Sequence, residues 1–499
     1  MKKMLCVFMS ACLGLVFAAC SKSAMKEGLN GAPFYDFSIS DEESMLGGGT
    51  QNEAYSEIIQ NTFLPTNEVS SQAFSLKVDT AAYSNVARYI NNGILPPVDA
   101  VRTEELINYF NYDEKLDVNE EHPFGVKAQV YPSPFAQGKY MAYVRVRTPD
   151  MDRSELPPSN LTFLIDTSGS MASYNKLDLL QRAFELLVEN LNENDVVSIV
   201  TYCGDAEVVL DSAEGNEKEK ILEAINGLSA GGSTAGQKGI QTAYQLAEKN
   251  FREGANNRVI LATDGDFNVG ISSVEELKEY ISTKRNSGVY FSALGFGTGN
   301  LKDETMETLA ANGNGNYSYI DNINTAKKVL VDEMGSNLFV VANDVKAEFQ
   351  FNPDSVKEFR LVGYENRKMS AEDFDDASKD AGEIGVGSDV VVLAELVLDE
   401  DYEEGKLLDV CIRYKTVEGN VSKEYVSTVE GVTEAASSDF LFAYSVASFA
   451  ELLRESDYIG EATAEDILEL AESNLGIDEK GYRTEFIELV TKYSEIKAG

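Results

Sequence analysis

Short apolar runs alternate with amphipathic stretches through the middle of the chain. The runs are rich in β-branched and aromatic residues, as buried strands are, and they span 161–165, 196–202, 206–210, 258–263, 289–296 and 316–320. Between most of them apolar residues recur at helical spacing, near 177–191, 217–228, 235–251, 273–285 and 303–311. This alternation predicts an α/β domain over residues 160–338, with a doubly wound, mostly parallel sheet and helices on both faces. The link from Tyr202 to Glu207 is too short for a crossover, so we expect one antiparallel strand at a sheet edge.

Strand-like segments predominate on both sides of this α/β domain. Two precede it, at 124–131 and 140–147, and five follow, at 345–351, 358–364, 389–397, 407–415 and 425–429. Neither group is obviously a complete sheet. We therefore expect one β-rich domain made of residues 124–148 and 345–435, into which the α/β domain is inserted. Helical patterns predict an amino-terminal α+β domain at 73–123 and a C-terminal helical region at 436–497.

The first twenty residues have the features of an export signal. Lys2 and Lys3 precede an apolar stretch, 4–17, which ends in small residues at Cys20. The string Phe17-Ala18-Ala19-Cys20 resembles a bacterial lipobox, which implies a signal peptide at 1–19 and a lipid on Cys20. Residues 20–72 show no sustained period and are expected to form a flexible tether. No later run is long enough to span a bilayer, so we expect a lipid-anchored protein of the bacterial cell envelope, at the outer membrane or cell surface.

Charge and composition exclude several classes of function. The 83 acidic residues outnumber the 42 basic ones and give a net charge of −41, which argues against nucleic acid as a partner. His122 is the only histidine, so triads and histidine zinc sites have a single candidate, which the sequence places in a solvated loop. Cys203 and Cys411 fall in different predicted domains, and two separate thiols are favoured over a disulfide.

Oxygen-bearing side chains gather where three predicted segments end or turn. Asp166, Ser168 and Ser170 directly follow the apolar run 161–165, and Asp264 follows the run that ends at 263. Thr234 lies in a glycine-rich loop just before a predicted helix. Ligand sites of open α/β sheets lie beyond the carboxyl ends of the strands, and hydroxyl and carboxylate oxygens suit Mg²⁺, Mn²⁺ or Ca²⁺. The alternative is a turn whose Asp and Ser cap a helix.

The string D-x-S-x-S at 166–170, with the later Thr and Asp, resembles the metal-ion-dependent adhesion site of von Willebrand factor type A domains. The resemblance implies that Asp166, Ser168, Ser170, Thr234 and Asp264 hold a divalent cation, with Mg²⁺ favoured and Mn²⁺ or Ca²⁺ as alternatives. It also implies that an acidic group of a partner completes the coordination. Residues 74–83, 95–97 and 102–110 resemble the amino-terminal domain that accompanies type A domains in a group of bacterial envelope proteins.

These expectations lead to a binding function. The favoured one is a lipid-anchored envelope protein, not an enzyme, that binds an acidic group of a protein or glycan through the metal. The alternatives are a structural or assembly factor, in which the ion serves stability, and a metal-dependent hydrolase, for which no general base or nucleophile is evident nearby. The acidic segment Asp373–Glu383 could bind Ca²⁺, but it has Ser378 and Ile384 at EF-hand positions that require Gly and Glu, so a solvated loop is favoured.

Overall fold

The computed structural model describes residues 53–118, 121–232, 236–265, 274–299, 301–376, 379, 381–418 and 421–498. The chain divides into two compact units, Met1–Gly47 and Gly48–Gly499, and the described residues all belong to the second. The predicted signal peptide, the lipidation site Cys20 and most of the predicted tether therefore lie outside the described residues. Within these ranges no helix combines the length and the apolar character that a membrane span requires.

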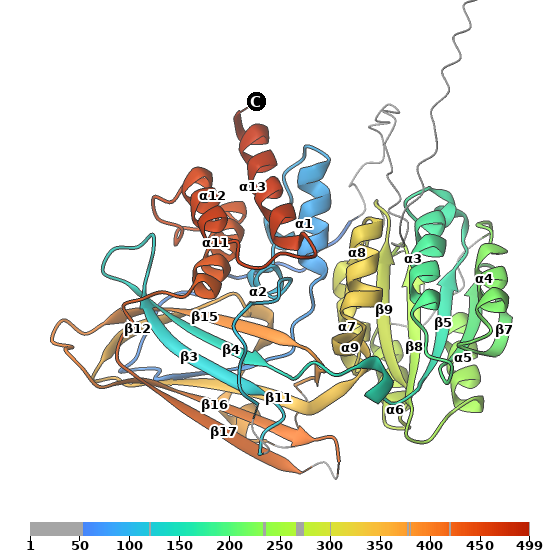
Figure 1. The fold of residues 1–499 in the computed structure, drawn as a ribbon, viewed down its shortest axis with the longest axis horizontal. Helices are drawn as coiled ribbons and strands as arrows, with labels where there is room; N and C mark the ends of the chain where they lie inside the picture. The colour runs from blue at the N-terminus through green and yellow to red at the C-terminus, as the bar shows by residue number, and fades with distance from the viewer. Residues whose placement is uncertain are drawn as a thin grey trace, which may run out of the picture. The chain divides into compact units, whose positions relative to one another are not determined.

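The α/β domain contains a six-stranded sheet in the order β10-β9-β8-β5-β6-β7 (Figure 1). Five strands are parallel, and β7 pairs antiparallel with β6 at the edge, as predicted. The strands are β5 (Ser159–Asp166), β6 (Val196–Tyr202), β7 (Ala206–Glu214), β8 (Asn256–Thr263), β9 (Tyr290–Phe296) and β10 (Tyr317–Ile320). β5 and β8 are buried along their whole length, which explains their uninterrupted apolar runs.

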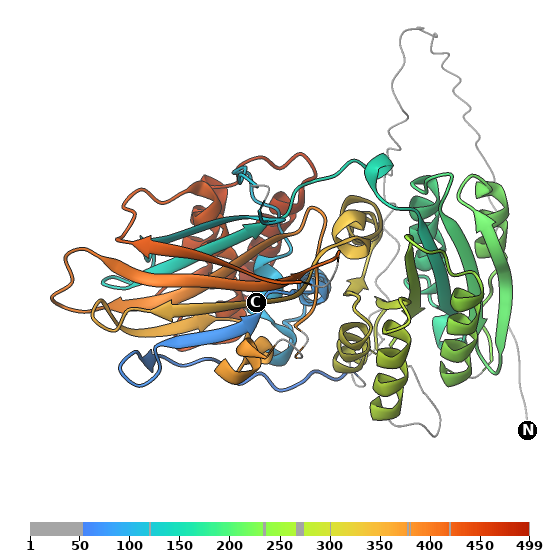
Figure 2. The same cartoon turned by 90° about the horizontal axis from the view of Figure 1, so that it is seen from below.

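Helices cover both faces of this sheet, so the predicted doubly wound fold is confirmed (Figures 1 and 2). One face packs against α3 (Leu177–Glu189), α4 (Lys218–Asn226) and the closing helical segment of the domain, and the other against α5 (Gly236–Lys249), α6 (Val274–Arg285) and α7 (Asp303–Asn312). The closing segment consists of α8 (Ile323–Lys327), the π-helical turn η4 (Lys328–Asp332) and α9 (Met334–Leu338). Each amphipathic helix buries its apolar side against the face of the sheet that it covers.

The β-rich part is a sandwich of two antiparallel sheets that share one apolar core. The first sheet has the order β1-β12-β15-β4-β3: β1 (Leu64–Pro65), β12 (Val356–Val362), β15 (Asp389–Leu398), β4 (Tyr140–Arg147) and β3 (Gly125–Pro132). The second has the order β13-β2-β11-β16-β17, with β14 also paired to β11: β13 (Lys368–Met369), β2 (Ser71–Ser75), β11 (Val340–Phe351), β16 (Lys406–Thr416), β17 (Ser422–Glu430) and β14 (Ile384–Gly385). Strands from before and after the α/β domain meet where β4 pairs with β15.

Helices from the two ends of the described chain pack together on the first sheet. α1 (Ala81–Asn91) and α2 (Thr103–Ile107) share an apolar core with α11 (Ser438–Leu453), α12 (Ala464–Ser473) and α13 (Tyr482–Ala498). Tyr143 of β4 and Leu393 of β15 belong to the same core, so these helices cover one face of the sheet (Figure 1). α2 is short, and a separate 3₁₀ turn (Val98–Ala100) precedes it.

The prediction that the tether extends to Gln72 is wrong for Glu53 onward. Glu53 forms a buried ion pair with Arg88 of α1, with Oε2 and Nη2 2.8 Å apart. The Asn61 amide donates hydrogen bonds to the carbonyl oxygens of Leu361 and Gly363, at 3.0 and 2.7 Å. β1 and β2 add strands to both sheets of the sandwich. This segment is held by an ion pair, by hydrogen bonds and by strand pairing, so it carries none of the apolar periodicity from which order is inferred.

Candidate metal-ion site

The candidate site lies at the carboxyl edge of the central strands of the α/β sheet. Asp166 is the last residue of β5, where it is opposite Tyr202, the last residue of β6. Asp264 directly follows β8, which is the other neighbour of β5. Parallel pairing therefore brings three strand ends to one place, and connections on opposite faces leave room there for a ligand.

Asp166 is fully buried and held by three donors. Its Oδ1 accepts a hydrogen bond from the backbone N–H of Ser168 at 2.8 Å, and its Oδ2 accepts from the hydroxyls of Tyr202 and Thr263 at 3.1 and 3.0 Å. Burial raises the pKa of the Asp166 carboxyl, the Ser168 hydrogen bonds lower it, and the negative charge of Asp264 raises it again. The carboxylate is thus fixed in orientation, and a nearby cation would favour its ionised form.

The two serine hydroxyls of the motif converge beside Asp166. Ser168 Oγ and Ser170 Oγ are 2.9 Å apart; Ser168 is buried, whereas Ser170 is half-buried at the start of a 3₁₀ turn (Gly169–Ala172). Two backbone hydrogen bonds hold this loop against the glycine-rich segment. The Gly231 N–H donates to the Thr167 carbonyl at 2.8 Å, and the Gly169 N–H donates to the Gly232 carbonyl at 3.1 Å. The predicted ligand Thr234, two residues further on, lies outside the described residues.

Asp264 is also fully buried, and it pairs with a lysine that sequence patterns gave no reason to select. Lys176 Nζ lies 2.8 Å from Asp264 Oδ2, and the side chains are 7% and 0% exposed. Lys176 directly precedes α3, ten residues after Asp166, so the site holds two buried carboxylates and one ammonium group. Burying two charges costs hydration free energy, so each group depends on the other for a charged partner.

The donor set fits a hard divalent cation. Two carboxylates and two hydroxyls come from the described residues, and oxygen ligands of this kind suit Mg²⁺, Mn²⁺ and Ca²⁺ better than Zn²⁺ or Cu²⁺. Among the described residues no group of three or more His, Cys, Asp or Glu could hold a metal, so this site would depend on hydroxyl oxygens as well as its two carboxylates. Sequence reasoning also missed Tyr202 and Thr263, which orient Asp166; their positions at the ends of strands adjoining β5 were the available signal.

Two other sequence candidates have structural roles. His122 lies in a loop, as predicted, but it is half-buried rather than solvated: its Nδ1 lies 3.0 Å from the Tyr414 hydroxyl, and its ring packs against Phe124 and Tyr425. Asp373 and Asp375 of the acidic segment form ion pairs with Lys379 and Arg413.

Cys203 and Cys411 are free thiols, as the sequence favoured.

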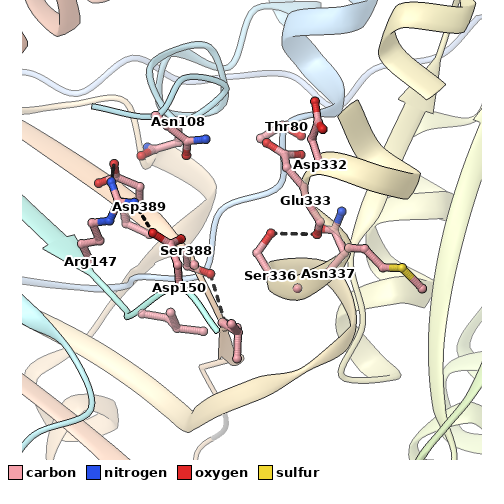
Figure 3. Close-up of a pocket in the computed structure, with 18 of the residues that line it drawn as sticks. Thr80, Asn108, Arg147, Asp150, Asp332, Glu333, Ser336, Asn337, Ser388 and Asp389 are labelled. Atoms are coloured by element: carbon pink, nitrogen blue, oxygen red, sulfur yellow. Dashed lines mark hydrogen bonds and ion pairs between the residues drawn. The ribbon is translucent and has the colours of Figure 1, made fainter. Parts of the chain in front are cut away.

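A polar cavity of about 730 Å³ lies elsewhere (Figure 3). It includes Asn316–Ser318 at the start of β10 and is therefore at the opposite edge of the sheet from Asp166. Its polar groups are engaged with one another: Arg147 contacts Asp150 and Asp389 at 2.9 and 3.4 Å, and Ser336 Oγ donates to the Glu333 carbonyl at 3.0 Å. These contacts define no ligand chemistry for the cavity.

Comparison with known proteins matches three parts of the chain to family models. The model described as von Willebrand factor type A domain matches residues 160–332, a second described as von Willebrand factor matches 49–142, and a third described as the C-terminal part of the uncharacterized protein YfbK matches 336–496. The chain is 40% identical over 441 residues to the uncharacterized protein YfbK of Escherichia coli, covering 84% of this chain and 77% of that protein.

More distant similarities centre on the α/β domain. Inter-alpha-trypsin inhibitor heavy chain H3 of Homo sapiens is 28% identical over 166 residues, which are 32% of this chain and 18% of that protein. Among solved structures, von Willebrand factor type A from Catenulispora acidiphila is 15% identical, with a TM-score of 0.43, covering 78% of this chain and 90% of that one.

Proposed function

We propose that this chain, which belongs to the family of the Escherichia coli protein YfbK and carries a von Willebrand factor type A domain, binds an acidic group of a partner through a divalent cation. Asp166, Ser168, Ser170, Asp264 and Thr234 would hold the ion, with Mg²⁺ favoured and Mn²⁺ or Ca²⁺ as alternatives. A carboxylate of a protein or an acidic glycan would complete the coordination. The observation that carries the proposal is the buried, hydrogen-bonded Asp166 beside the converging hydroxyls of Ser168 and Ser170.

We propose binding and not catalysis because the described residues around Asp166 offer no proton acceptor besides the carboxylates themselves. Burial raises the pKa of Tyr202 well above its usual range, which makes it a donor at neutral pH. Lys176 is held by Asp264. Hydrolysis assisted by a metal would require a base or nucleophile placed at the reacting atom.

The test measures Mn²⁺ binding to the full-length chain from the electron paramagnetic resonance signal of free Mn²⁺. Ser170→Ala removes a ligand hydroxyl and should weaken Mn²⁺ binding at least about tenfold, while Asp166→Asn should abolish it at micromolar metal. Ser159→Ala is the matched control, because Ser159 is a buried serine of the same strand whose hydroxyl has no hydrogen-bond partner. Equal Mn²⁺ affinity in Asp166→Asn and wild type would overturn the proposed site.

The acidic partner is tested with a poly-glutamate peptide as carboxylate probe. We expect the peptide to bind in Mn²⁺ and to be released by EDTA, because the contact is coordination to the metal. The net charge of −41 opposes the encounter at long range, so moderate salt should strengthen binding by screening the repulsion. Binding that persists in excess EDTA would contradict the mechanism.

The proposed place of action is the bacterial cell envelope, through a lipid on Cys20. The support is the lipobox-like string that ends at Cys20, at the end of an apolar stretch. Cys20→Ser should shift the protein from the membrane fraction to the soluble fraction after a high-salt wash, since one modified residue would provide the whole anchor. Retention of Cys20→Ser in washed membranes would show that another segment anchors the chain.

A further inference from the structure

The Lys176 side chain reaches the candidate site across a glycine, which leaves room for it. Its backbone caps α3, since Leu180 N–H donates to the Lys176 carbonyl at 2.8 Å, and its side chain runs inward to Asp264. The stem passes over Gly297, which directly follows β9. A Cβ atom at Gly297 would lie 2.3 Å from Cγ of Lys176 and 2.7 Å from its Cε, so any other residue would obstruct the lysine.

The backbone at Gly297 is fixed in the conformation that leaves this passage. Gly297 has φ +73°, which L side chains rarely adopt, and its carbonyl accepts a hydrogen bond from the buried Tyr319 hydroxyl at 2.5 Å. The segments after β8 and β9 and the one before α3 therefore meet at a single buried ion pair. The Lys176 side chain is 7% exposed and its ammonium is paired with Asp264, so the positive charge belongs to the site.

The charge of Lys176 changes what the site can bind. The two negative charges of ionised Asp166 and Asp264 would together balance the charge of a divalent cation. The ammonium of Lys176, beside Asp264, offsets one of these two negative charges. A divalent cation would then remain under-neutralised by the protein. At short range in a buried site such a charge acts strongly on a bound cation, because little water screens it.

We infer that Lys176 is a built-in competitor of the metal, which weakens the retention of a divalent cation until an anionic group of a partner supplies the missing negative charge. The inference rests on the proposed function and deepens it, since it couples metal and partner binding at the same site. The coupling is reciprocal: a carboxylate ligand tightens the metal, and the metal tightens the carboxylate ligand by the same factor.

The experiment compares Mn²⁺ affinity in full-length wild type, Lys176→Met and Lys176→Gln without any ligand. Both variants should bind Mn²⁺ roughly tenfold more tightly than wild type, because they remove a positive charge beside a metal ligand. In wild type a poly-glutamate peptide should tighten Mn²⁺ binding, and in both variants that tightening should shrink several-fold. Lys328→Met is the matched control: Lys328 is a buried lysine of the same domain that pairs with Glu333 in the closing helical segment, and its variant should bind Mn²⁺ like wild type.

The outcomes separate this inference from the proposed function. If wild type binds Mn²⁺, Asp166→Asn does not, and the folded Lys176 variants bind no more tightly than wild type, the inference is overturned while the metal site stands. If no form binds Mn²⁺, both are overturned. Thermal unfolding gives a second readout: Mn²⁺ should raise the melting temperature of Lys176→Met more than that of wild type, since the ion replaces the lost ammonium beside Asp264. An equal or smaller rise contradicts the inference even if the variant is unstable without metal.

Discussion

Replacing Arg145 by Met is expected to lower the free energy of unfolding by about 3–5 kcal/mol, because it removes the cation that two buried carboxylates contact most closely. Arg145 is fully buried in β4. Its guanidinium contacts Asp389 of β15 through Nε and Nη2 at 2.6 and 2.7 Å, and Asp439 of α11 through Nη1 at 3.2 Å. It also donates to the carbonyl oxygens of Tyr112 and Glu114 at 2.6 and 2.7 Å.

This residue ties together parts of the chain that the α/β domain separates. β4 precedes that domain and β15 follows it. Asp439 lies in the first turn of α11 and accepts hydrogen bonds from the N–H groups of Asp113 and Glu114, both at 2.9 Å. Arg145 donates five hydrogen bonds, to acceptors in β15, in α11 and in the segment that contains Tyr112 and Glu114. An apolar side chain could form none of them. The arginine therefore closes the split sandwich against its helical layer.

Urea unfolding of the full-length protein, followed by circular dichroism, measures the effect. Arg147→Met is the matched control on the same strand; Arg147 is partly exposed and contacts Asp150 and Asp389 at 2.9 and 3.4 Å, so its loss should cost about 1 kcal/mol or less. Adding Asp389→Asn to Arg145→Met should recover part of the loss, because it removes one stranded charge. If Arg145→Met and Arg147→Met unfold at the same urea concentration, the assigned role of Arg145 is wrong.

The sequence predicts the α/β sheet well because its five parallel strands are buried almost throughout, with only the edge strand β7 largely exposed, and because each helix is buried on one side. Apolar runs such as 161–165 and 258–263 follow directly from that burial, and so does the place of Asp166 and Asp264 at strand ends. The local string from Asp166 to Ser170 also places its hydroxyls in one loop. These features depend on neighbouring residues and on sheet periodicity, both of which the sequence displays.

The features that the sequence conceals depend on contacts between distant segments. Lys176 becomes part of the site because a glycine 121 positions later leaves space for it, which no local pattern displays. Asn61 donates hydrogen bonds to two carbonyl oxygens at the end of β12, about 300 residues away, and nothing in the local composition of its segment indicates this order. His122 is half-buried in its loop because the rings of Tyr414 and Tyr425, from two distant strands, pack against it.

The buried acidic residue Glu105 of α2 is a further feature that the local sequence does not predict. Glu105 is fully buried, although an acidic residue in the first turns of a helix is ordinarily exposed. Its Oε1 lies 2.5 Å from Nε of Arg102, and its Oε2 accepts a hydrogen bond from the N–H of Ala82 at 2.9 Å. Arg102 in turn contacts Asp303 of α7 at 2.5 Å, so the cluster joins the amino-terminal helices to the α/β domain.

A second arginine and two further carboxylates complete this cluster. Arg367 lies 3.2 Å from both Asp79 and Glu307 and 3.9 Å from Glu105. The pKa of Glu105 is raised from 4.5 to about 7, chiefly by burial: Arg102 and Arg367 lower the pKa, Glu307 and Asp79 raise it, and the rise from burial outweighs the arginines. The carboxylates outnumber the two arginines, so the folded protein favours a proton on Glu105 more than the unfolded chain does.

Glu105 should therefore make the fold less stable as pH rises, and Glu105→Gln should remove that dependence. A group whose pKa is raised by folding contributes stability that is fully present below pH 4.5 and is lost as pH rises through about 7. We expect the unfolding free energy of Glu105→Gln, relative to wild type, to increase across this window, because glutamine mimics the protonated acid at every pH. Urea unfolding at a series of pH values measures this difference, and it should persist in about 0.5 M NaCl, since burial and not diffuse surface charge is its cause. A difference that stays flat, or that falls as pH rises, would show that Glu105 is ionised throughout and that Arg102 and Arg367 outweigh its burial.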